Sequence, residues 1–176
     1  TSDDMPYDNL TGNVHGGSNM PVTGTTTVNI LPNAQVQFVF GGGTTAGVAD
    51  KASVNVSGGT VTREVYGGGA GNGDAETTVG STAVTLTGGK LQDHIYGGGF
   101  AVKDNADNNY VAGDTSVTVK DETGSDALVI ADGKNIYGGG NGSKVSGSST
   151  ITIDTDTKAA AGTTKIFGGS TDNYHR

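Results

Sequence analysis

Oxygen-bearing side chains gather in one segment of the sequence that could hold a cation. Asp104, Asp107 and Asn109 lie close together, and Ca²⁺ prefers several oxygen ligands on a flexible loop. Neither the EF-hand spacing nor the nonapeptide calcium repeat is present, so solvated turns are the favoured interpretation. A Ca²⁺ site at these three residues is the alternative, and no other cofactor is predicted.

Residues that could perform hydrolysis or elimination are not grouped in a catalytic pattern. Asp154 and Asp156 would share one face of a strand, but we expect no neighbouring repeat to add acids in the same columns, so the cluster of carboxylates that such an enzyme needs is not predicted. The three histidines are far apart in sequence and do not match a zinc pattern. The sequence favours a protein that is not an enzyme, and a carbohydrate-active lyase or hydrolase is the alternative.

Aromatic residues recur at one position, each followed by glycines. This set contains Phe40, Tyr66, Tyr96, Tyr137 and Phe167. Stacked in space, these rings would form either an exposed strip for sugar rings or a structural ladder stabilised by ring contacts. Phenylalanine at both ends of the set favours the structural ladder, because Phe offers a ligand no hydroxyl group.

Short alternating runs supply a second repeated feature. The polar positions of these runs are Thr27, Asn29, Ser53, Asn55, Thr85, Ser116, Thr118, Thr150 and Thr152, with Ala83 interrupting one column. On a stacked sheet they form two polar columns that could bind a glycan or a host protein. Ice binding is a minor alternative, and the β-propensity of Thr on a solvated strand explains the pattern without any ligand.

These residues must be positioned by a repeating unit. Aromatic-glycine steps occur at Phe40, Tyr66, Tyr96, Tyr137 and Phe167, with a degenerate copy at His15, at spacings of 25, 26, 30, 41 and 30 residues. A β-branched residue precedes each copy. Repeats of this length are supersecondary units that bury their apolar faces by stacking on one another.

Each repeat contains a strand, a corner and a shorter strand. Alternation such as Ser53-Val54-Asn55-Val56 indicates a strand with one buried face. Glycine pairs such as Gly58-Gly59 supply the positive φ angles of a sharp corner. We therefore predict an all-β protein, a right-handed parallel β-helix of five to six coils. A β-sandwich is the alternative, but it would not explain the fixed aromatic-glycine register.

Composition and charge limit the environment and partners. The chain has 176 residues, with 32 Gly, no Cys and a net charge of -8. The negative charge disfavours binding to nucleic acid or anionic membranes. No apolar run is long enough for a transmembrane helix. The chain without disulfides must be held together by its backbone ladder and core.

The Val/Ile-Tyr-Gly-Gly-Gly step with its upstream Ser/Thr-Val-Thr-Val run resembles repeats of large bacterial surface β-helix proteins of adhesin type. The resemblance covers about residues 24–170 and implies an extracellular location, at the bacterial cell surface or secreted. It also implies a non-enzymatic role as a rigid stalk or an adhesin.

The sequence divides into three parts on this interpretation. Residues 1–23 would form an N-terminal cap or degenerate first coil, residues 24–170 the solenoid repeats, and residues 171–176 a C-terminal tail. Because the ends of a stack carry unpaired backbone groups, we also expect end-to-end self-association or continuation into a longer chain.

Overall fold

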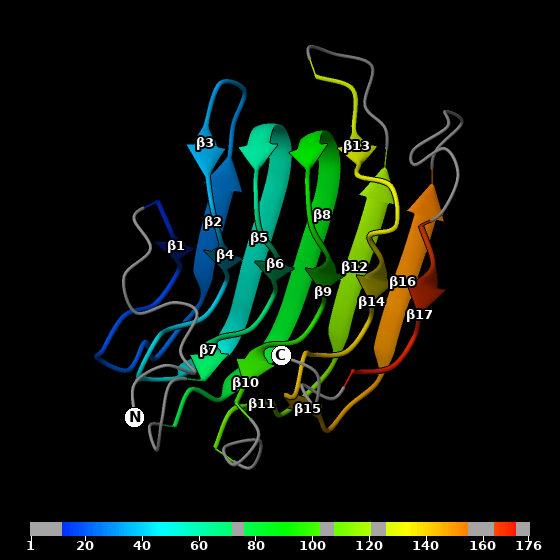
Figure 1. Cartoon of the computed structure of the whole chain (residues 1–176). Coiled ribbons are helices and arrows are strands. Elements are labelled where there is room, and N and C mark those ends of the chain that lie inside the picture. Colours follow the sequence, from blue (N-terminus) through cyan, green and yellow to red (C-terminus); the bar gives the residue numbers. More distant parts are fainter. Residues whose placement is uncertain (1–11, 72–75, 103–107, 121–125, 155–163, 172–176) are drawn as a thin grey trace.

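The chain is a parallel β-solenoid (Figure 1), as the sequence predicts. The computed structural model describes residues 12–71, 76–102, 108–120, 126–154 and 164–171, and no helix occurs among them. The solenoid has about four turns, so the expectation of five to six coils is wrong. The outer repeats complete only part of the circuit: the third sheet contains just β7 and β10 within the described residues.

Long strands side by side form the broad wall of the solenoid. These are β2 (Thr26–Ile30), β5 (Val48–Val61), β8 (Val79–Leu91), β12 (Thr115–Lys120) and β16 (Ser149–Asp154). They pair in parallel, with Val54 opposite both Val28 and Val84. The parallel pairing of successive repeats excludes the β-sandwich alternative, whose sheets are antiparallel.

Short strands close the remaining sides of each coil. The second sheet stacks β1 (Val14–His15), β4 (Val39–Phe40), β6 (Val65–Tyr66), β9 (Ile95–Tyr96), β14 (Ile136–Tyr137) and β17 (Ile166–Phe167). The third sheet contains β7 (Ala70–Gly71) and β10 (Phe100–Ala101). The long wall is extended at its ends by β3 (Gln35–Val36), β11 (Tyr110–Val111), β13 (Val129–Ile130) and β15 (Lys144–Val145). We refer to the first two sheets as the long sheet and the short sheet.

An aliphatic core fills the space between the long and short sheets. Val54, Val56 and Leu86 are fully buried, and they pack with the β-branched residues that precede the motif aromatics. Burying such side chains contributes roughly 1.5–3 kcal/mol each. The last coil differs, because Ile153 and Ile166 are 46% and 50% exposed. The core is therefore complete in the middle coils and open at β16 and β17.

Hydroxyl groups connect the two sheets inside the solenoid. One inward column of the long sheet contains three buried threonines, Thr26, Thr82 and Thr115. Each donates a hydrogen bond through Oγ1, at 2.5–2.6 Å, to the carbonyl of the glycine that directly follows the motif aromatic of its own coil. Ala52 occupies the matching position of the second coil. This inward column of hydroxyl groups was not predicted from the sequence. In a run of alternating Val and Thr residues, the sequence does not show whether an adjacent Thr side chain points inward or toward solvent.

We expect Thr82→Val to lower the free energy of unfolding by about 1–2 kcal/mol, because the buried Gly97 carbonyl loses its hydroxyl donor. Valine conserves the shape of Thr, so the change removes the hydrogen bond and leaves the packing volume nearly unaltered. Urea unfolding measures the loss. Thr82→Ser keeps the hydroxyl group and serves as the control. Equal destabilisation by the two substitutions would contradict a role for the hydrogen bond.

Candidate functional site

The motif aromatics form a continuous stack along the short sheet. Successive ring centroids from Phe40 to Phe167 lie 4.9–5.0 Å apart, and interplanar angles stay at or below 10°. Phe40, Tyr66 and Tyr96 are buried, whereas Phe167 is 42% exposed. The rings lie on the opposite face of the short sheet from the aliphatic core and contact Phe38, Ala70 and Phe100. In the middle coils these rings therefore cannot stack on a sugar from solvent.

His15 extends the aromatic stack at its N-terminal end. Its ring is 4.8 Å from Phe40, at an interplanar angle of 1°, and its Nδ1 is buried without a hydrogen-bond partner. Burial lowers the pKa of His15 below its ordinary value of 6.5, since the protonated ring loses solvation. The degenerate copy of the repeat thus supplies an imidazole ring to a stack whose other members are Phe and Tyr rings.

The depressed pKa of His15 predicts a loss of stability in mild acid. Below pH 6.5 the His15 ring is protonated more readily in the unfolded chain than in the folded chain. The contribution of the neutral ring to the free energy of unfolding is therefore fully present above that pH. It is lost as the pH falls toward the folded pKa. Urea unfolding at pH 7.5 and 5.5 measures the loss, and His15→Phe should reduce the difference. An unchanged pH dependence in the variant would contradict the assignment.

Polar side chains form two columns on the outer face of the long sheet. One column contains Thr27, Ser53, Ala83, Ser116 and Thr150, and the other contains Asn29, Asn55, Thr85, Thr118 and Thr152, all in register. These side chains are exposed on β2 and β16 and half-buried between them. The Asn55 amide donates to the Asn29 side-chain oxygen at 2.9 Å. We call these ten residues the polar face.

The three candidate calcium ligands are only partly within the described residues. Asp104 and Asp107 lie outside them. Asn109 is 1% exposed, and its side-chain amide donates to the carbonyl of Phe100. Among the described residues no group of three or more His, Cys, Asp or Glu side chains could hold a metal ion.

A cluster of polar side chains lies just before β9 and β14 in the chain and contains Asp93, His94 and Lys134. Asp93 is 6% exposed, and Lys134 Nζ lies 2.8 Å from its Oδ1. Burial raises the pKa of Asp93, but hydrogen bonds from Lys134 and the His94 backbone, together with the nearby positive charge, lower it overall. His94 Nδ1 accepts a hydrogen bond from the Asn135 backbone at 2.8 Å. The ion pair between Asp93 and Lys134 joins two neighbouring coils.

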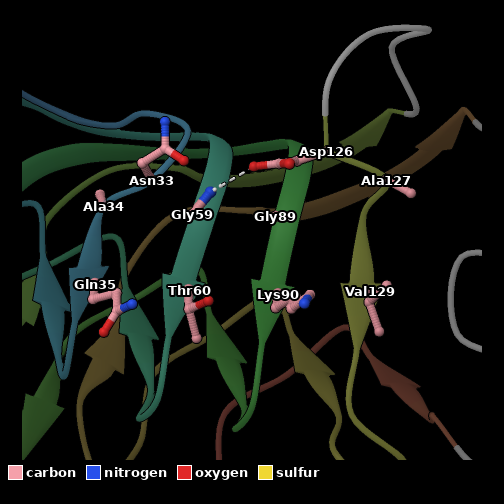
Figure 2. Close-up of a pocket in the computed structure, with 10 residues that line it drawn as sticks. All are labelled: Asn33, Ala34, Gln35, Gly59, Thr60, Gly89, Lys90, Asp126, Ala127 and Val129. Atoms are coloured by element: carbon pink, nitrogen blue, oxygen red, sulfur yellow. Dashed lines mark hydrogen bonds between the residues drawn. The ribbon is translucent and has the colours of Figure 1, made fainter.

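A groove lies at the corner where the long strands bend. Its floor is a row of outward side chains on four neighbouring strands, namely Gln35, Thr60, Lys90 and Val129, with Asn33 and Asp126 above it (Figure 2). The groove has a volume of about 360 Å³. We call these six residues the corner groove. It was not predicted from the sequence, although Thr60 and Lys90 each follow a Gly-Gly pair in the repeat.

Tight turns shape the upper wall of the corner groove. Asn33, Gly59 and Gly89 have φ angles of 71°, 76° and 94°, a conformation that glycine adopts without strain and that Asn tolerates. Asp126 comes from the inserted segment of the fourth repeat and accepts a hydrogen bond from the Gly59 backbone N–H at 3.1 Å (Figure 2). The insertion therefore places a carboxylate beside the turns of two earlier coils.

Comparison with protein-family models, curated proteins and solved structures found no match to this chain. Within the described residues, no helix has the length and hydropathy required to span a membrane. The class of protein rests on the architecture alone: the chain is a β-solenoid built from aromatic-glycine repeats.

Proposed function

We propose that this protein is a non-enzymatic extracellular module, a rigid stalk or adhesin that binds a glycan or host protein through the polar face. The observation that carries the proposal is the in-register array of Ser, Thr and Asn side chains across five long strands. Hydroxyl and amide groups both donate and accept hydrogen bonds. A regular array of them on a flat sheet offers a partner many equivalent weak contacts.

Mechanical rigidity supports the role of a stalk. The middle coils are joined by parallel strand pairing, stacked rings and buried hydroxyl contacts between the sheets. Each coil contacts mainly its neighbours, so the array would transmit force along its axis. The net charge of -8 favours solubility and opposes non-specific adhesion to anionic surfaces. The repeat's resemblance to bacterial surface proteins favours a cell-surface or secreted location.

An array of glycans and extracellular-matrix proteins tests the proposal. We expect the intact chain to bind at least one class of probe, and the double variant Thr85→Lys/Thr118→Lys to lose that binding. Both positions face solvent on central strands, so the substitutions disturb the polar face without altering the core. Thr45→Lys, at an exposed residue outside the polar face, is the matched control.

Three outcomes would count against parts of the proposal. No binding to any probe would remove the adhesin role and leave a stalk. Binding that survives the double variant would place the site elsewhere than the polar face. Cleavage of any neutral or acidic polysaccharide incubated with the protein would favour a carbohydrate-active enzyme instead.

A further inference from the structure

We propose that the corner groove is a second binding site, separate from the polar face, and that its ligand is an uncharged linear oligosaccharide. The floor residues Gln35, Thr60 and Lys90 lie in register on neighbouring strands. Strands in a sheet are about 4.8 Å apart, so the row extends along the solenoid axis. A ligand that follows the row must itself be extended.

The polar side chains of the groove are available to a ligand. Within the described residues, Asn33, Gln35 and Lys90 form no side-chain hydrogen bond or ion pair, and all three are exposed. The Thr60 hydroxyl is likewise uncommitted. Figure 2 shows Gln35, Thr60, Lys90 and Val129 in one row below the turns. Three uncommitted polar groups on the floor and one above it form a pre-organised site, which lowers the entropic cost of binding.

The mixture of donors and acceptors fits hydroxyl groups. Asn33 and Gln35 both donate and accept, Lys90 donates, and the Asp126 carboxylate accepts. The Asp126 side chain is held in place by the Gly59 N–H. Sugar hydroxyls can satisfy each of these groups, and the Val129 side chain offers an apolar surface to the C–H groups of a sugar ring.

Charge and backbone pairing exclude two other ligand classes. An acidic polysaccharide would face a protein of net charge -8 and a groove in which Asp126 opposes Lys90. An extended peptide that binds by strand addition needs a free sheet edge. Under the groove, β5 and β8 are paired on both sides, so a peptide could add as a strand only beyond β3 or β13, at the ends of the groove and not along its floor.

Two-dimensional NMR of the intact protein, titrated with neutral glucose, xylose and mannose oligosaccharides, tests the inference. We expect at least one to shift the backbone amides of Gly59 and Gly89 and the side-chain amides of Asn33 and Gln35. Gln35→Ala and Lys90→Ala should each weaken binding about five- to tenfold, the effect of one lost hydrogen bond. Lys51→Ala, at an exposed Lys on the outer face of β5, is the matched control and should leave binding unchanged.

The same titration separates this inference from the proposed function. If the shifts map to Thr85 and Thr118 and not to the groove, the groove assignment is wrong while binding by the polar face stands. Groove shifts with a silent polar face would support the inference and contradict the polar face as the site. Stronger binding of hyaluronan or alginate fragments, or of an extended peptide, would overturn the ligand class. A complete absence of shifts would overturn the groove as a site.

Discussion

Replacing Gly67 with Ala is expected to lower the free energy of unfolding by about 3 kcal/mol or more, at or above the upper end for overpacking. A Cβ atom at this position would lie 2.2 Å from the Gly97 carbonyl oxygen and 3.0 Å from Thr82 Cβ. The obstacle is the backbone of the next coil, which cannot rotate away as a flexible side chain would. Relief therefore requires the short sheet to separate from its neighbour.

The matched control for Gly67→Ala is available in the chain itself. Gly168 takes the same place in the last repeat, directly after Phe167, and a Cβ there would meet no atom of the described residues within 4 Å. Gly168→Ala should change stability little, about 0.5 kcal/mol or less. Urea or thermal unfolding of the two variants measures the contrast. Similar losses at both positions would show that an intrinsic property of glycine, rather than the stacking distance, determines the cost.

Replacing Tyr66 with Ala is expected to destabilise the fold by about 3–5 kcal/mol, the range for removing a large buried aromatic side chain. Tyr66 is fully buried and lies between the rings of Phe40 and Tyr96, each with its centroid 4.9 Å away. The substitution removes two stacking contacts and leaves a cavity that rigid neighbours cannot fill. The fluorescence-monitored unfolding transition should shift to markedly lower urea concentration.

Two further variants separate the causes of this loss. Tyr66→Phe keeps the ring but removes the hydroxyl that accepts a hydrogen bond from the Asn141 amide at 3.2 Å, so a smaller cost of about 1 kcal/mol is expected. Phe167→Ala removes a half-exposed ring that, among the described residues, stacks on Tyr137 alone, and it should cost less than Tyr66→Ala. If Phe167→Ala were as costly as Tyr66→Ala, the explanation from burial would fail.

The end of the stack at β16 and β17 explains why equivalent repeat positions differ in importance. Ile153 is 46% exposed, whereas Val119, its neighbour in the same column, is 2% exposed. The two side chains are chemically similar, so the difference comes from β16, which covers Val119, whereas no described strand covers the far side of β16. Substitutions should therefore be least costly in the last repeat and most costly in the second and third.

The repeating unit of this protein follows from its amino-acid sequence alone. The Val-Asn-Val alternation around Asn55 and the glycine pair at Gly58-Gly59 predict a strand and a corner, because side-chain periodicity and backbone sterics are local properties. The step of 12 residues from Val54 to Tyr66 recurs from Val84 to Tyr96. This recurrence predicts the register of these coils, because parallel coils can stack only if equivalent residues align. These local signals were sufficient to predict the parallel solenoid.

Which faces are covered and which groups come into contact depends on how the coils pack in three dimensions. Thr82 and Thr85 are both Thr on the same strand, yet one is buried against the Gly97 carbonyl and the other lies on the polar face. The corner groove likewise brings Asp126 beside Gly59, 67 residues earlier in the chain. Such contacts depend on the path of the chain at Asp126, where the repeat pattern is interrupted. Local periodicity carries no information about that path, so the groove and the number of complete turns could not be predicted from the sequence.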